Sequence, residues 1–185
     1  TDFASIINSK GTAAQKALLG KSSTDWQREI YRNAISIDNN VSITGSIKNT
    51  PVRASVGYLN QNGILKTSNM DRISTSIGVS PSFFNNSLKV DLNLKSSVIN
   101  NNFANQGAIG TAVGFDPTQS VTGSDFGGYF EWLDPATKKP NSLGPKNPVG
   151  LLNLQKDKST VNRTIANAVF DYKMPFLPEL RANAN

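Results

Sequence analysis

One segment of the chain alternates between apolar and polar residues over most of its length. From Ile35 to Lys48 most odd positions carry isoleucine or valine, and the even positions carry serine, threonine, asparagine, aspartate or lysine. An apolar period of two residues is typical of a β-strand with one apolar and one polar face. Strands in soluble proteins have about five or six residues, whereas a strand tilted across a bilayer needs about 9–11. A run of about fourteen residues therefore predicts a strand of a membrane barrel.

Four later runs repeat this alternation at the spacing of consecutive hairpins. They cover residues 52–58, 72–79, 88–95 and 163–172. In the last run Ile165 and Val169 fall among the polar positions and blur the pattern. We therefore predict an all-β fold, an antiparallel meander with one face against lipid. A soluble secreted β-sandwich that binds carbohydrate or mediates adhesion also alternates, and it remains the alternative interpretation.

The connections between these runs differ in length. Tight turns are expected at residues 48–51, 83–87 and 175–179, which contain asparagine or proline and fall at alternate strand ends. Longer connections cover residues 60–70 and 103–159. Short turns at one rim and long loops at the other are the arrangement of outer-membrane barrels.

The first 33 residues follow a helical pattern instead. Their apolar spacing, broken at Gly11 and closed at Gly20, predicts two short helices. A third helix is expected from Thr24, where Thr-Asp-Trp-Gln has the form of a capping box with Thr24 as the cap. We expect Trp26 to pack this helix on a neighbouring barrel wall. The chain thus divides into residues 1–33, 34–102, 103–159 and 160–185, the last holding one strand, a turn and the start of the next strand.

Composition excludes several classes of function. The 185 residues contain no cysteine and no histidine, which removes disulfides, thiolate metal sites and the commonest metal ligand and general base. The 13 acidic residues form no close pair that suggests a catalytic carboxylate, so we expect no enzyme. The net charge is +6, but no basic stripe or aromatic stacking platform appears, so we expect no nucleic-acid binding. No apolar run approaches the roughly 18 residues that a spanning helix needs.

The long glycine-rich stretch holds three aspartates, Asp116, Asp125 and Asp134. Loop carboxylates suit a hard cation such as calcium, which makes a calcium site one possibility. Their spacing fits no familiar calcium loop, and capping of turns is the alternative. No other cofactor or metal is expected.

Several motifs, in this order along the chain, resemble the SusC/RagA branch of TonB-dependent outer-membrane transporters. They are Thr24–Arg32 (TDWQREIYR), Thr44–Gly45 at the end of the first strand, Ala54–Ile64 (ASVGYLNQNGI), Asp71–Ser74 (DRIS) and Asn147–Val149 (NPV). The resemblance covers essentially the whole chain. The first residue is not Met and residues 180–185 look like the start of another strand, so we expect a piece of a longer polypeptide.

The resemblance implies a large, about 22-stranded transmembrane β-barrel filled by a plug domain. It implies nutrient uptake, with import of oligosaccharides, peptides or other large nutrients across the outer membrane of a Gram-negative bacterium, using energy from the TonB complex. The TonB complex would be contacted through parts absent from this chain. A SusD-like surface lipoprotein is the implied partner, acting as a lid. By the same resemblance residues 1–33 are the first extracellular loop, residues 103–159 a long extracellular loop facing the lid, and the turn after residue 172 periplasmic.

Two sets of residues are candidates for contact with partners. In the long loop we single out four aromatic residues for contact with substrate or lid, with a role in the loop's own core as the alternative. They are Phe126, Tyr129, Phe130 and Trp132. On the polar parity of the strands we expect six residues to face the lumen, where they line the channel or, more in keeping with a filled barrel, contact the plug. They are Arg53, Arg72, Lys89, Asp91, Asn93 and Lys95.

Overall fold

The computed structural model describes residues 2–124, 126–177 and 179–185. These residues form two compact units that are interleaved along the sequence. The sheet unit consists of Ile35–Asn62, Asn69–Asn101 and Ser159–Asn185. The loop unit consists of residues up to Ala34 together with Gly63–Ser68 and Asn102–Lys158.

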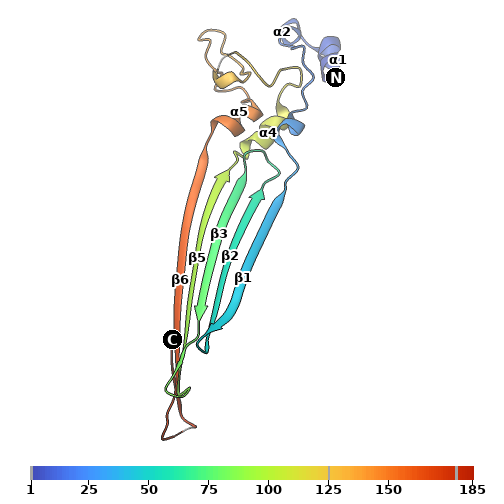
Figure 1. The fold of residues 1–185 in the computed structure, drawn as a ribbon. Coiled ribbons are helices and arrows are strands. Elements are labelled where there is room, and N and C mark those ends of the chain that lie inside the picture. The colour runs from blue at the N-terminus through green and yellow to red at the C-terminus, as the bar shows by residue number, and fades with distance from the viewer. Residues whose placement is uncertain (1, 125, 178) are drawn as a thin grey trace. The chain divides into compact units, whose positions relative to one another are not determined.

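The sheet unit is built on five long strands, drawn side by side in Figure 1. They are β1 (Ser36–Ile47), β2 (Thr50–Asn62), β3 (Asn69–Val79), β5 (Leu88–Phe103) and β6 (Asp157–Lys173). Two short strands, β4 (Ser82–Phe83) and β7 (Arg181–Ala184), extend the sheet. The strand order is β1-β2-β3-β5-β6-β7, with β4 against β5. All five alternating runs therefore form strands, and β7 lies where a further strand was expected.

The long strands have 11 to 17 residues, about twice or more the usual length in soluble proteins. Their tight turns agree with the sequence. Lys48 and Asn49 have φ angles of 45° and 66°, the left-handed pair that a two-residue hairpin turn requires. Asn85 and Asn86 adopt positive φ in the turn before β5. In the expected turn at residues 175–179, Pro178 lies outside the described residues.

The loop unit contains short helices around a small apolar core. They are α1 (Asp2–Lys10), α2 (Ala13–Ala17), α3 (Trp26–Ile30), α4 (Gly107–Gly114), the 3-10 turn η1 (Phe126–Gly128) and α5 (Pro148–Leu154). The buried core residues come from three separate parts of the chain, and they are Trp26, Ile30, Leu65, Ala108, Ala112, Phe115, Val149 and Leu152. The helices α1 and α2 match the sequence pattern, whereas α4 and α5 form in a stretch for which no helix was predicted.

Two expectations about the third helix are wrong. Asp25 caps α3, its carboxylate accepting from the backbone N–H of Arg28 at 3.1 Å. The hydroxyl of Thr24 donates instead to the carbonyl of Gln119 at 2.6 Å, and Thr24 lies one residue before the cap position that Asp25 occupies. Trp26 does not pack on a strand wall as predicted, because its ring is buried in the loop unit's own core, 4.6 Å from the ring centre of Phe115. Both errors have one cause, a tertiary contact with residues about 90 positions later.

None of the described helices is long and apolar enough to cross a membrane.

Candidate functional site

Most apolar side chains of the sheet unit lie on one face. The register pairs Val41 with Val56 and Ile43 with Ala54, and Ala54 in turn pairs with Ile77. Directly paired residues point to the same side of a sheet, so the apolar parities of β1, β2 and β3 coincide. A one-residue shift in any of these strands would move its apolar residues to the opposite face.

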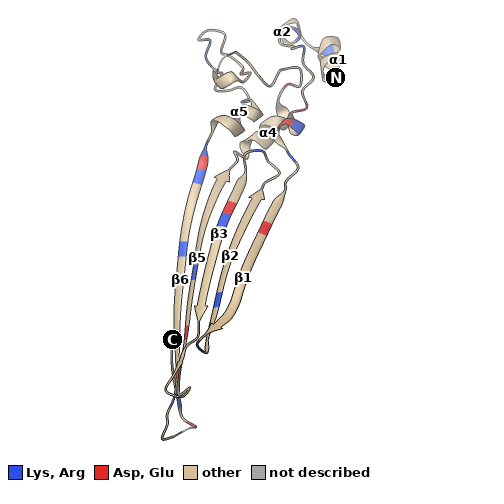
Figure 2. Ribbon diagram, in the orientation of Figure 1, with Lys and Arg blue, Asp and Glu red and all other residues tan. Residues whose placement is uncertain are grey.

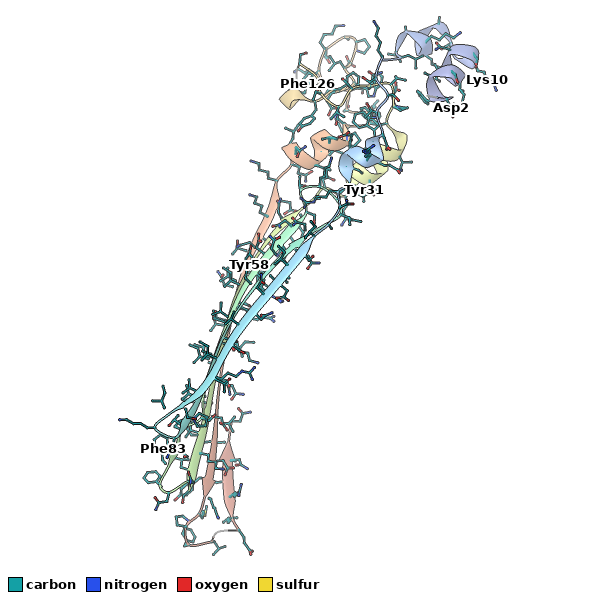
Figure 3. The ribbon with its side chains drawn as sticks, turned by 45° about the vertical axis from the view of Figure 1, so that its right-hand side comes forward. Asp2, Lys10, Tyr31, Tyr58, Phe83 and Phe126 are labelled. Carbon is teal, nitrogen blue, oxygen red and sulfur yellow. The ribbon has the colours of Figure 1, made fainter. Side chains whose placement is uncertain are left out.

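Most of this apolar face is exposed in the described part of the chain, with Val90 on β5 as a buried exception. Ile43 is 73% exposed, Val56 55%, Ile77 50% and Leu92 43%. In a β-sandwich such residues form the buried layer between two sheets. The described residues contain no second sheet over them, because their strands all belong to one seven-stranded sheet. Figure 3 shows side chains standing out from this sheet.

Polar residues replace the apolar ones near one end of this face. Tyr58 and Asn60 lie on the apolar parity of β2, and both donate to the carboxylate of Asp71 on β3, at 3.3 and 2.5 Å. Asn62 and Asn69 continue the polar sequence with a hydrogen bond of 3.3 Å. On β2 the apolar surface therefore ends at a tyrosine, as in the aromatic belts at membrane interfaces, whereas on β1 it continues through Ile37.

The opposite face carries hydroxyl, amide and charged groups. The hydroxyls of Ser55 on β2 and Ser76 on β3 are hydrogen bonded at 2.6 Å. Arg53 pairs with Gly78, whose Cα faces Asn93 of β5 so closely that an added Cβ would lie 3.0 Å from the Asn93 side-chain oxygen. All six residues predicted to face the lumen share this polar parity; they are Arg53, Arg72, Lys89, Asp91, Asn93 and Lys95.

Two hollows lie next to each other on this polar face, and together we call them the polar groove. The first has a volume of about 470 Å³ and is lined by Thr44, Pro51, Val52, Arg53, Ser76, Ile77, Gly78, Ser80, Asn93 and Lys95. The second has a volume of about 300 Å³ and is lined by Asn40, Ser55, Gly57, Ser74, Thr75, Ser76, Lys95, Ser96, Ser97, Arg163 and Ile165. Ser76 and Lys95 border both hollows. The groove therefore crosses β1, β2, β3, β5 and β6.

Arg163 is a groove residue that the sequence did not single out. It lies on β6, where Ile165 and Val169 interrupt the alternation and hide the polar parity. The hydrogen bond between Ser96 and Thr164, at 3.1 Å, aligns β6 with β5 and places Arg163 and Ile165 beside Lys95. The alternation alone could have placed Arg163 on the polar face, because Arg163 lies an even number of residues before Asn167 and Asp171.

Charged residues are sparse along the strands (Figure 2). Within the described sheet unit, the ion pair is Arg181 with Asp171, at 3.6 Å. Arg53, Lys95 and Arg163 have exposed side chains and no hydrogen-bond or ion-pair partner among the described residues. Arg72 differs, because its Nε atom is buried without a partner in the described part of the chain.

The four aromatic residues singled out in the long loop occupy two kinds of position. Phe130 and Trp132 pack edge to face with ring centres 5.2 Å apart, and Phe130 lies 6.2 Å from Phe115. Tyr129 also packs against the core, with part of its surface exposed. Phe126 is 37% exposed. Three of the four thus contribute to the loop's own core, and Phe126 has the most exposed ring.

Asn147 organises the long loop, and the sequence singled it out only as part of a motif. Its side chain is fully buried and makes four hydrogen bonds. The amide oxygen accepts from the N–H groups of Val149 and Gly150 at the start of α5, and the amide nitrogen donates to the carbonyls of Val121 and Phe130. A buried amide with all bonds made fixes one loop conformation.

The loop aspartates cap turns where the structure describes them. Asp116 accepts from the backbone and hydroxyl of Thr118, at 2.8 and 2.7 Å. Asp134 accepts from the backbone N–H groups of Thr137 and Ala136, and the Thr137 bonds are the main cause that lowers the pKa of Asp134. Asp125 lies outside the described residues. Within residues 2–124, 126–177 and 179–185 no cluster of three or more acidic residues could hold a metal ion.

The fold and its two faces define a class of protein: an all-β segment of long antiparallel strands with few short helices. No family model matches the chain. In an alignment of 183 positions that covers 90% of this chain, the chain is 41% identical to the TonB-dependent receptor SusC of Bacteroides thetaiotaomicron. The chain is therefore similar to a segment of a SusC-type TonB-dependent receptor, and the resemblance seen in its motifs is confirmed. It spans 18% of the length of that relative.

Proposed function

We propose that residues 1–185 form part of the wall and outer loops of a TonB-dependent nutrient transporter in the outer membrane of a Gram-negative bacterium. The apolar band contacts the bilayer, and the polar face looks into the pore. The remainder of the polypeptide supplies the further strands of a large barrel, about 22 in all, and its plug. The protein acts by binding and gating, without covalent chemistry.

The exposure of the apolar face carries this proposal. Isolated exposed apolar residues are ordinary, but a continuous band over four long strands is costly in water. Lipid removes that cost, because hydrocarbon is as apolar as the side chains. The two outer edges of the sheet have unpaired backbone groups, which a bilayer cannot satisfy, so further strands must pair with them. The likeness to SusC supports the same assignment.

The loop unit has a proposed role at the outer mouth of the barrel. Phe126 and the exposed parts of Tyr129, Phe130 and Trp132 contact the nutrient or a SusD-like surface lipoprotein acting as a lid. Aromatic rings stack on sugar rings and anchor protein interfaces. The six polar-face residues named above line the channel or contact the plug. The nutrient is an oligosaccharide, a peptide or a similarly large molecule.

Detergent extraction tests the proposal on the intact polypeptide. We expect the protein to leave membranes only with detergent and to migrate differently in gels before and after heating, as closed barrels do. Uptake of a labelled oligosaccharide or peptide by cells should depend on both the protein and TonB. A deletion strain complemented with the empty vector is the control. Recovery as a soluble monomer would return the β-sandwich alternative.

A further inference from the structure

We infer that the apolar face of the sheet unit holds one glycolipid of the outer leaflet, a lipopolysaccharide molecule. One of its acyl chains lies in a hollow between β3, β5 and β6, and its sugars contact polar residues farther along β5 and β6. This inference rests on the proposed function, because it needs that face to lie in a bilayer. It adds a lipid partner for the barrel wall.

A hollow with a volume of about 350 Å³ lies on the apolar face, and we call it the apolar hollow. Two of its lining residues, Asn93 and Asn167, have the polar parity and border it through their backbone. Its lining contains no charged side chain. The other six lining residues have the apolar parity of their strands; they are Ile77, Val79, Leu92, Leu94, Ala166 and Ala168.

Two alanines produce the apolar hollow. Ala166 and Ala168 place methyl groups on β6, whereas β3 and β5 carry isoleucine, valine and leucine around the same space. Small side chains beside large ones leave room for a hydrocarbon chain that contacts both. Lipid and side chains are equally apolar, so the stabilisation comes from close packing and not from removal of water.

The apolar hollow remains accessible to lipid in a complete barrel. The pore and its plug belong to the polar face, on the other side of the sheet. β3 and β5 are interior strands, each already paired on both sides, so no further strand can pair with them. A strand pairing with the outer edge of β6 would add side chains beside Ala166 and Ala168. Because side chains stand roughly perpendicular to a sheet, such a strand would deepen the hollow.

A row of polar residues continues the same face of β5 and β6 toward the long loop. The hydroxyls of Ser96 and Thr164 are 3.1 Å apart, and the hydroxyl of Thr160 donates to the side-chain oxygen of Asn100 at 2.8 Å. Even steps separate Ser96 from Leu94, so the row and the apolar hollow share one face. Val98 is an apolar residue within it. The polar row consists of Ser96, Asn100, Thr160, Asn162 and Thr164.

The distance between the two parts fits an acyl chain of the outer leaflet. Leu94 and Asn100 are six residues apart, which is about 20 Å along a strand. A strand tilted by about 40° covers about 15 Å of depth over that length, half of a hydrocarbon core of about 30 Å. A lipid whose sugars contact Asn100 therefore reaches the apolar hollow with the end of its acyl chain.

The chemistry of the polar row favours sugar over phosphate. Its side chains are hydroxyls and amides, which exchange hydrogen bonds with sugar hydroxyls, and none is a cation. Phosphate sites depend on arginine or lysine. On the same face Asp71 accepts from Tyr58 and Asn60, and its carboxylate disfavours a phosphate nearby. A glycolipid therefore suits this face better than a phospholipid.

Lipid that stays bound to the intact, detergent-purified protein tests the inference. Mild acid hydrolysis followed by mass spectrometry measures lipid A, the acylated sugar part of lipopolysaccharide, per protein. The variant A166L/A168L fills the apolar hollow and should lower bound lipid A about threefold or more. A54L is the matched control, because Ala54 lies on the same face, paired with Ile77, but does not line the hollow. We expect A54L to bind as much lipid A as the wild type.

A second pair of variants tests the contact with sugars. The probes are galactosyl diacylglycerol and phosphatidylglycerol with identical acyl chains, offered together to the delipidated intact protein. We expect the wild type to prefer the galactosyl lipid and N100A to lose about threefold of that preference. N101A is the matched control, because Asn101 donates to Ser159 at 3.2 Å on the polar face. We expect N101A to keep the preference.

Three results overturn the inference. They are equal amounts of lipid A on the wild type, A54L and A166L/A168L; release of phospholipid alone from the wild type; and an equal preference in N100A and N101A. All variants should show the heat-dependent gel shift of the wild type. If A166L/A168L loses that shift, the comparison of N100A with N101A decides, since neither variant changes the hollow.

Failure of this inference can be told apart from failure of the proposed function. If the protein needs detergent for extraction and shows the heat-dependent gel shift, but its bound lipid ignores all these substitutions, the transporter assignment stands and the lipid site is wrong. If the protein is extracted without detergent and shows no gel shift, the proposed function itself fails.

Discussion

Asn147 donates from its side-chain nitrogen to the backbone carbonyl of Phe130, at 3.1 Å, while its side-chain oxygen accepts the first free N–H groups of α5. One buried amide therefore joins the aromatic strand-like segment of the long loop to the helix that leads into β6. The conformation of the long loop depends on the hydrogen bonds of this one side chain.

Replacing Asn147 by alanine should loosen the long loop. Two carbonyls and two N–H groups would lose their partner in a buried site, and we expect a loss of about 2–4 kcal/mol in the stability of the loop unit. Limited proteolysis of the intact protein should then cut residues 102–158 faster. Asn153→Ala is the matched control, because the Asn153 side chain is exposed and donates one bond, to Val149. Equal cutting of both variants would contradict the role given to Asn147.

Gly20→Ala should destabilise the loop unit, chiefly through contact with the backbone of Thr118. The added Cβ would overlap the carbonyl oxygen of Thr118, whose hydroxyl also accepts from the Gly20 N–H at 2.9 Å. We expect a cost of about 1–3 kcal/mol, as for other overpacked sites. Gly110→Ala in α4 meets nothing within 4 Å and should instead stabilise by about 0.5–1 kcal/mol. Thermal unfolding monitored by protease resistance separates the two, and a stable G20A protein would count against the contact.

Charge placed on alternate positions of β1 should have opposite consequences. Ile43→Lys puts an ammonium on the apolar face and should cost about 2–4 kcal/mol if that position lies near the bilayer midplane. Ser42→Lys places the same charge one residue away on the polar face and should cost little. Urea unfolding of the intact protein from lipid vesicles measures both. Similar costs for the two variants would mean that the apolar face does not touch lipid.

Phe126→Ala and Trp132→Ala should separate binding from loop structure. Phe126 is the more exposed ring, so its loss should weaken lid or nutrient binding while protease resistance of the loop stays unchanged. Trp132 packs on Phe130, and its loss should expose the loop to protease. Pull-down of the surface lipoprotein, with proteolysis in parallel, reports both properties. Unchanged binding by Phe126→Ala would remove that residue from the proposed contact surface.

The turn at Asp134 should weaken in acid. Hydrogen bonds from Thr137, first from its backbone N–H, hold the pKa of Asp134 below its ordinary value of 3.8. A carboxylate with a lowered pKa in the folded state adds stability above its ordinary pKa, and this contribution is lost as the pH falls through the folded pKa. Hydrogen exchange at the Thr137 amide should therefore deviate, below about pH 4, from the normal acid dependence in the wild type. Asp134→Asn, which carries no titrating group, should not show that deviation.

The predicted strands and the observed ones agree because alternation is a local property. The run from Ile35 to Lys48 forms β1 within one residue at each end, since an apolar period of two suits only a sheet with two different faces. The turn at Lys48 and Asn49 was equally readable, because asparagine tolerates the positive φ angle that the hairpin imposes.

The helices of the loop unit were predicted less completely, because they depend on packing between distant segments and not on a local pattern. The helix α4 has the sequence GAIGTAVG, whose three glycines weaken any helical signal, and it is held by packing of Ala108 and Ala112 in the core. Thr24 was predicted to cap α3, but its hydroxyl donates to the carbonyl of Gln119 and Asp25 is the cap. The groove residue Arg163 was missed because Ile165 disturbs the pattern of β6.

By itself the amino-acid sequence determined the strands, their two faces and the likeness to SusC, since each depends on neighbouring residues or on motifs in order. Only the tertiary structure decided that Trp26 and Phe115 share a core, that Asn147 joins Phe130 to α5, and that Arg53, Lys95 and Arg163 border one groove. Those relations arise from strand register and from contacts between segments tens of residues apart, and no local pattern encodes them.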